Sequence, residues 1–159
     1  MSQAPEIYCL LMPLTNIRML LPNAAIGEII VHRGALASCA GPRWLLGLLN
    51  WREQAVPVVA YEGLVGGQLP PADAHRLRIA IIHLPTEDGT QPIGIVLQGY
   101  PTLIKIEPGV LKTKPMELTD PAILNHHRAI IGTTEVLIPD CGSLRACLLK
   151  LASMRSQDI

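Results

Sequence analysis

Short apolar runs separated by turn residues make up most of the chain. Runs of this kind, bounded by Gly, Pro, Asn or Asp, are typical of β-strands. They predict strands at residues 7–14, 17–21, 29–32, 77–84, 92–99 and 103–106. Asp88-Gly89 is a strong turn signal between two of these strands, and 129–138 reads as a further hairpin. Many short strands with frequent turns favour small β-barrels over one open sheet.

Few segments favour a helix. Asn23 is a good N-cap for a short helical turn through AAIGE. Pro42 suits the first turn of another short helix, and 61–65 is long enough for one turn only. The tail 143–154 has apolar residues at helical spacing behind Ser143, which predicts a C-terminal helix.

The clearest linker is 65–75, VGGQLPPADAH, which is rich in Gly and Pro and has no periodicity. It divides the predicted strands of one domain, 1–159, into two groups. We expect one subdomain at about 17–65 with part of the C-terminal segment, and a second at about 76–140 with the N-terminal strand. The predicted architecture is two small β-barrels that share an apolar seam.

The most hydrophobic stretch is 44–61, WLLGLLNWREQAVPVVAY, which is interrupted once by Arg52-Glu53-Gln54. Two apolar arms predict a hairpin that is buried on both faces, at the seam between the barrels. The tip of the hairpin must then reach the protein surface, where the two rigid strands hold Arg52 in a fixed position. An arginine there can form a forked bond to a carboxylate or bind backbone carbonyls of a partner.

Composition argues against several classes of function. Lys+Arg and Asp+Glu both number 13 and aromatic residues make up 3% of the chain, a poor composition for binding nucleic acid. Apolar residues make up 49%, enough for a large core and an apolar surface for a partner.

No apolar run reaches the length of about 18 residues that a membrane-spanning helix needs. The four cysteines lack C-x-x-C spacing, which predicts free thiols in a cytoplasmic protein.

The sequence shows no recognisable active site or metal site. His126 and His127 are the most conspicuous polar pair, but adjacent residues of a strand point to opposite faces, and we expect them on a surface loop. Glu87-Asp88 fits a turn, and Ser38 has no base implied nearby. We therefore expect no catalytic residue, no cofactor and no bound metal.

The hairpin resembles the signature of CheW-like chemotaxis coupling proteins. That signature runs G-hydrophobic-hydrophobic-N-L-R-G and, after two residues, V-P-hydrophobic-hydrophobic-D-L. The matching positions are Gly47, Asn50, Arg52, Val56, Pro57, Val58 and Val59. Upstream, AIGEII is similar to the family's V-x-E-I segment, with Ile26, Glu28 and Ile29 in register. Downstream, IGIVLQGY resembles the second-barrel strand, so that the similarity covers nearly the whole chain.

The chain departs from the signature at four positions. Glu53 replaces the Gly after the arginine, and Ala60 replaces the Asp after the V-P strand. Gln98 replaces the Asp after the second-barrel strand. Pro139 interrupts the last expected strand and suits only an edge or a bulge. The chain therefore resembles a divergent member.

The resemblance implies a mainly β fold of two SH3-like five-stranded barrels around a shared aliphatic core, with short helices and a C-terminal helix. It also implies a non-catalytic adaptor that couples a chemoreceptor to a CheA-type histidine kinase. One surface would bind the kinase regulatory domain, and another the cytoplasmic tip of the receptor. Together with the hairpin, it makes Ile26, Glu28, Trp51 and Arg52 the expected receptor contacts.

Three alternatives stay open at this point. Arg52 could simply pair with a nearby acid, Glu28 or Glu53. The chain could be a small-molecule-binding or enzymatic β-barrel that uses the His126-His127 region. It could also be a structural domain whose surplus of apolar residues forms a homodimer.

Overall fold

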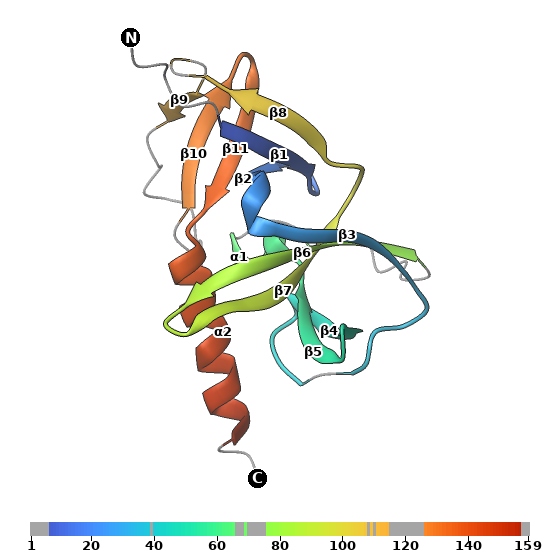
Figure 1. The fold of residues 1–159 in the computed structure, drawn as a ribbon. Coiled ribbons are helices and arrows are strands. Elements are labelled where there is room, and N and C mark those ends of the chain that lie inside the picture. The colour runs from blue at the N-terminus through green and yellow to red at the C-terminus, as the bar shows by residue number, and fades with distance from the viewer. Residues whose placement is uncertain are drawn as a thin grey trace.

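The computed structural model describes residues 7–38, 40–65, 69, 76–107, 109, 111–114 and 126–156. These residues form two curled β-sheets and few helices, with one sheet above the other in Figure 1. The predicted fold class, two small β-barrels with a C-terminal helix, is confirmed.

One sheet has six strands in the order β8-β1-β2-β11-β10-β9. The bounds of its strands are β1 Ile7–Pro13, β2 Arg18–Pro22, β8 Thr102–Ile106, β9 Leu111–Lys114, β10 His126–Ile131 and β11 Thr134–Pro139. Neighbouring strands are antiparallel except β11 and β2, which are parallel. The pattern of apolar residues did not predict β9, so this sheet has one strand more than the expected five.

The other sheet has five strands in the order β3-β6-β7-β5-β4. The bounds of its strands are β3 Ile26–Arg33, β4 Leu45–Trp51, β5 Gln54–Val59, β6 Arg76–Thr86 and β7 Gly89–Leu97. An isolated bridge between Ala37 and Leu48 continues the pairing beyond β4.

The predicted division of the chain at 65–75 does not match the strand pairing. β6 and β7, which follow this segment, pair with β3 and β5, which precede it. The N-terminal strand β1 lies beside β8, as expected, whereas β2, which was expected in the first subdomain, lies between β1 and β11. A Gly/Pro-rich stretch marks a break in secondary structure, but long-range burial decides which strands pair. Most of the linker lies outside the described residues.

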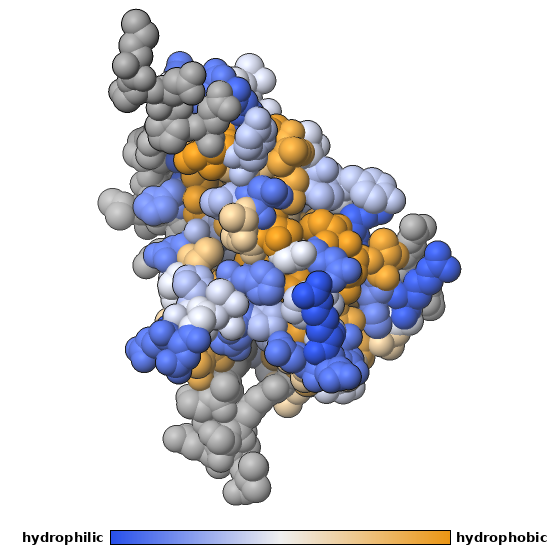
Figure 2. All heavy atoms as spheres, in the orientation of Figure 1, coloured by the Kyte–Doolittle hydropathy of each residue, from blue (hydrophilic) through white to orange (hydrophobic). Residues whose placement is uncertain are grey.

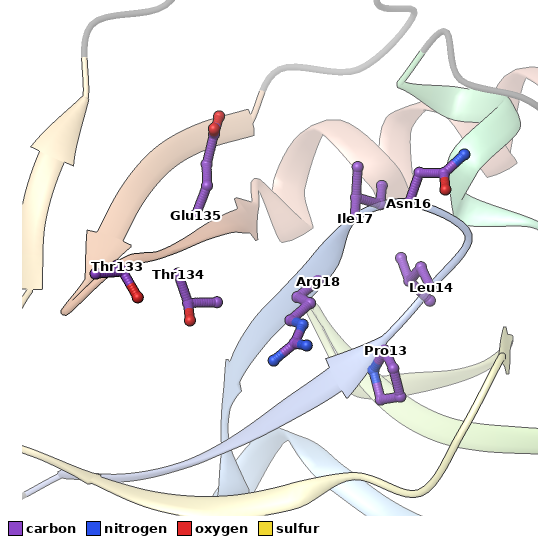
Figure 3. Close-up of a pocket in the computed structure, with 8 residues that line it drawn as sticks. All are labelled: Pro13, Leu14, Asn16, Ile17, Arg18, Thr133, Thr134 and Glu135. Atoms are coloured by element: carbon purple, nitrogen blue, oxygen red, sulfur yellow. The ribbon is translucent and has the colours of Figure 1, made fainter.

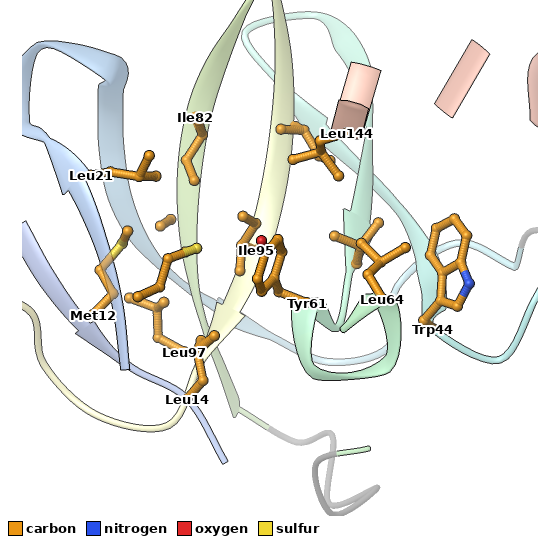
Figure 4. Packing of buried hydrophobic residues seen from close by; sticks show 14 of the residues in the cluster. Met12, Leu14, Leu21, Trp44, Tyr61, Leu64, Ile82, Ile95, Leu97 and Leu144 are labelled. Atoms are coloured by element: carbon orange, nitrogen blue, oxygen red, sulfur yellow. The ribbon is translucent and has the colours of Figure 1, made fainter. Parts of the chain in front are cut away.

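Both sheets bury side chains on their two faces, which creates three apolar clusters. One cluster fills the five-stranded barrel around Val56, Val58, Ile79 and Ile81. A second, around Cys9, Leu20 and Val136, fills the six-stranded barrel. The third and largest lies between the sheets, and Figure 4 shows side chains from both of them meeting there.

The period of two residues in a strand explains how the same strands serve two clusters. In β6, Ile79 and Ile81 point into the barrel, whereas Ala80, Ile82 and Leu84 point into the cluster between the sheets. A continuous apolar run is therefore required here, because neither face of the strand is open to water.

Two hydrogen bonds also tie the sheets together. The backbone N–H of Thr15, in the β1–β2 turn, donates to the fully buried carboxylate of Glu62 at 2.9 Å. Glu62 lies in α1, Tyr61–Leu64, directly after β5 of the other sheet. The N–H of Gln98, after β7, donates to the carbonyl of Pro13 at the end of β1 at 2.8 Å.

The helices confirm some predictions and correct others. The expected single turn is α1. The expected C-terminal helix is α2, Cys141–Ser156, which is capped by Asp140 and begins before the predicted Ser143. The Asp140 carboxylate accepts from the N–H groups of Gly142 and Ser143, as an N-cap does. Residues 42–44 form a turn instead of the predicted helix. None of the described helices has the length and apolarity needed to cross a membrane.

The expected turn at Asn23 is a 3-10 helix, η1, Asn23–Ala25, without a side-chain cap. It ends earlier than predicted, because β3 already begins at Ile26. Ile26 and Glu28 therefore lie on a strand and not on a helical turn. Hydrogen bonding of β3 to β6 outweighs the weak local helix signal of AAIGE.

The hairpin of β4 and β5 is only partly buried, which corrects the prediction for its arms. β4 is at the edge of its sheet, and Leu46 and Asn50 on its outer face are exposed. β5 is interior and contributes Val56 and Val58 to the barrel and Val59 to the cluster between the sheets. The hairpin thus forms one wall of the five-stranded barrel.

The Glu62 contact can be tested by two substitutions. Glu62→Ala leaves the Thr15 N–H without its acceptor and should lower the free energy of unfolding by about 2 kcal/mol. Glu62→Gln keeps a carbonyl oxygen as acceptor and should lose clearly less. Urea denaturation followed by tryptophan fluorescence measures both values, and equal stability of the two variants would contradict a structural role for this bond.

Candidate functional site

The tip of the β4–β5 hairpin is a two-residue turn, since Trp51 pairs with Gln54. Arg52 and Glu53 both have positive φ, 48° and 65°. Positive φ at both central residues is the geometry of a type I′ turn, which matches the twist of a hairpin. Gly and Asn usually occupy these positions, so the chain accepts backbone strain to place an arginine and a glutamate there.

Trp51 supports this turn from inside the barrel. It is only 9% exposed and packs in the cluster with Leu49 and Val56. Its Nε1–H donates to the Glu28 carboxylate at 2.8 Å, which joins β4 to β3. We expected Trp51 to offer its surface to a partner. Instead its burial makes it a support for the residues around it.

Arg52 is exposed and lies on the ring of Trp51. The guanidinium carbon is 4.6 Å from the ring centroid, within the range of a cation–π interaction. Among the described residues, neither Glu28 nor Glu53 forms an ion pair with Arg52. Glu28 instead accepts the indole N–H. The local pairing considered as an alternative is therefore not formed.

His83 is a member of the site that the sequence did not indicate. It lies on β6, with its ring centroid 5.9 Å from that of Trp51 and the two planes tilted by 54°. Its imidazole also packs on Gly27, where even a methyl group would overlap with the ring. Gly27 sits at a register shift of β3 against β6. Nothing in the local sequence of β6 could have shown that its histidine meets the hairpin tip.

These residues border a small pocket of about 220 Å³. Its lining residues are Trp51, Arg52, Gln54, His83, Thr90 and Pro92. They come from the β4–β5 hairpin and from both strands of the β6–β7 hairpin. We call this the hairpin-tip pocket.

The expected site residues are thus only partly brought together. Glu28, Trp51 and Arg52 are linked by a hydrogen bond and a cation–π contact. Ile26 is half-buried and packs against the cluster between the sheets, so it does not line the pocket.

A larger pocket of about 520 Å³ lies on the six-stranded sheet (Figure 3). It is lined by residues of the β1–β2 connection and by Thr133, Thr134 and Glu135 of the β10–β11 hairpin. Glu135 pairs with Arg128 at 3.4 Å. The lining of this pocket therefore includes short polar side chains and a glutamate, Glu135, that already forms an ion pair.

The His126-His127 pair lies on β10 and not on the predicted surface loop. Pairing with Ile138 and Pro139 of β11 holds this segment extended, which the sequence pattern had missed. Among the residues that the structure describes, no group of three His, Cys, Asp or Glu side chains is placed to hold a metal.

Among the described residues, Cys9, Cys141 and Cys147 form no disulfide bond. Burial raises the pKa of the Cys9 thiol. Burial and the nearby Asp140 raise the pKa of Cys141. Both thiols are therefore less reactive than an exposed cysteine. Cys39 lies outside the described residues.

The six-stranded sheet exposes large apolar side chains on β1 and β8. Ile7, Tyr8 and Leu103 are 49%, 50% and 56% exposed. Leu103 belongs to β8, which is the edge strand of its sheet, and β1 lies beside it. Figure 2 shows hydrophobic atoms gathered over this upper sheet. Exposed apolar side chains on an edge strand are a feature of protein-binding surfaces.

The family model of the CheW-like domain matches residues 9–144. The chain belongs to the CheW-like domain family. Its fold is similar to that of the scaffolding protein TtCheW from Thermoanaerobacter tengcongensis, with a TM-score of 0.68. The two share 15% sequence identity, over 86% of this chain and 90% of that chain. A sequence search of curated proteins found no match.

The departures of this CheW-like chain from the family signature now have structural positions. Glu53 occupies a turn position with positive φ, where Gly has no steric cost. Ala60 is fully buried, and its N–H donates to the carbonyl of Trp44. The Gln98 side chain is exposed while its backbone ties the two sheets together. Pro139 is the last residue of β11, where the strand ends.

The positive φ of Glu53 predicts that glycine at this position gives a more stable protein than alanine. Glu53→Gly should unfold with a free energy about 1 kcal/mol higher than Glu53→Ala, because only glycine adopts positive φ without cost. Denaturant titration measures this difference. At Gln54, where φ is ordinary, the same comparison should reverse, with the Gly variant less stable than the Ala variant. A Gly variant less stable than the Ala variant at both positions would show that the turn is not strained.

Proposed function

We propose that this CheW-like protein is a non-catalytic adaptor that couples the cytoplasmic tip of a chemoreceptor to the regulatory domain of a CheA-type histidine kinase. Membership of the family supports this role. The observation that carries it is Arg52, an exposed cation held on a buried tryptophan without an ion pair among the described residues. In this role the protein acts in the cytoplasm.

The hairpin tip is the proposed receptor-binding surface. Glu28 and Arg52 are both exposed and are joined through Trp51, so an acid and a base stand side by side at the barrel surface. Ile26 adds a half-buried apolar side chain on the same strand as Glu28. An acid and a base on a barrel surface, with an apolar residue on one of the strands, suit an amphipathic helix of the receptor tip. Trp51 takes part by fixing the positions of Arg52 and Glu28.

The exposed face of β1 and β8 is the proposed surface for the kinase regulatory domain. The family resemblance implies that this domain has the same double-barrel form, and edge strands of two barrels can pack together. Tyr8 and Leu103 supply apolar area. This surface belongs to the six-stranded sheet, whereas the hairpin tip belongs to the five-stranded sheet, so both partners can bind at once.

Charge reversal at Arg52 tests the receptor site. Arg52→Asp should weaken binding of a receptor-tip fragment by at least about tenfold, because it replaces an attraction to acidic groups with a repulsion. Isothermal titration calorimetry measures the affinity, and thermal unfolding checks the fold. Arg33→Asp is the matched control, since Arg33 is an exposed arginine of the same barrel outside the pocket. Unchanged binding in folded Arg52→Asp protein would rule out this site.

A further inference from the structure

We propose that the hairpin-tip pocket binds one carboxylate side chain, a glutamate or an aspartate, of the partner helix, with His83, Gln54 and Thr90 assisting Arg52. The inference rests on the proposed function and specifies the chemistry that this surface recognises. It also assigns a binding role to the β6–β7 hairpin, which the sequence resemblance does not include.

The chemistry of the lining points to an anion. Besides Trp51, whose indole N–H is already donated to Glu28, four of the six lining side chains carry hydrogen-bond donors, namely Arg52, Gln54, His83 and Thr90. None of the six is an aspartate or a glutamate. Glu28 already accepts the indole N–H of Trp51, and Glu53, the neighbour of Arg52 in the turn, does not line the pocket. An incoming carboxylate would therefore meet several donors and no competing acid in the lining.

Two of these donors, Arg52 and His83, are also held in place before a ligand arrives. Arg52 lies on the Trp51 ring, and Trp51 is anchored by burial and by Glu28. His83 is held between Trp51 and the backbone at Gly27. Side chains fixed in this way lose little conformational entropy on binding, which strengthens the contact.

The size of the pocket selects one side chain rather than a free metabolite. Its volume is about 220 Å³, smaller than the roughly 300–1,000 Å³ of typical small-molecule sites. A planar carboxylate matches the flat fork of a single arginine. Arg52 supplies the one fixed cation of the lining, whereas sites for phosphorylated peptides are typically built from clusters of arginines.

NMR titration of the full chain with N-acetylglutamate N-methylamide tests the inference without any partner protein. We expect the signals of Trp51 Nε1–H, the His83 ring and the Gln54 amide to shift together. N-acetylglutamine N-methylamide is the matched neutral probe and should leave them in place. Arg52→Gln should weaken the response about tenfold, because a charge-assisted bond is lost. Arg33→Gln should leave it unchanged.

Two results would overturn the inference. One is an equal response to the charged and neutral probes, and the other is a carboxylate response that survives in Arg52→Gln. Either can occur while the receptor-tip fragment still binds, in which case the adaptor role stands without this pocket. Conversely, a carboxylate-specific response in a chain that binds no receptor tip would support the pocket and count against the receptor assignment.

Discussion

The apolar cluster between the two sheets is the constraint on which the rest of this structure depends. Strands such as β6 send alternate side chains into their own barrel and into this shared cluster, so that neither barrel is packed without the other. Met12, Met19 and Leu137 contribute from the six-stranded sheet. The Glu62–Thr15 hydrogen bond adds a directional tie at the same junction. Surfaces on different barrels are therefore held at fixed positions relative to one another.

This rigidity gives the hairpin tip the properties that the proposed binding site requires. Arg52 lies on a short turn with positive φ, above a tryptophan that is part of the barrel core. The same tryptophan orients Glu28 and contacts His83, so one buried ring organises three polar groups. A partner that binds here meets a preformed surface. On the other sheet, the antiparallel pairing of β1 and β8 brings the exposed Tyr8 and Leu103 together on the proposed kinase-binding surface.

Much of the fold was readable from the sequence, because apolar runs and turn residues set where strands begin and end. The β6–β7 hairpin and the position of Arg52 at a hairpin tip followed directly from such signals. The pairing of strands across the linker could not be predicted from such signals, since burial between distant segments gives no signal in the local sequence. Burial of Trp51 and the approach of His83 to Gly27 were missed for the same reason. Both depend on how β3, β4 and β6 meet in space.

We propose that one rigid chain carries two separate docking surfaces and joins two proteins through them. Sedimentation velocity of a receptor-tip fragment and a kinase regulatory domain, with and without this chain, tests it most directly. We expect a ternary complex in which the receptor fragment and the kinase domain sediment together only when the chain is present. Mutual displacement of the two partners, or binding of neither, would contradict it.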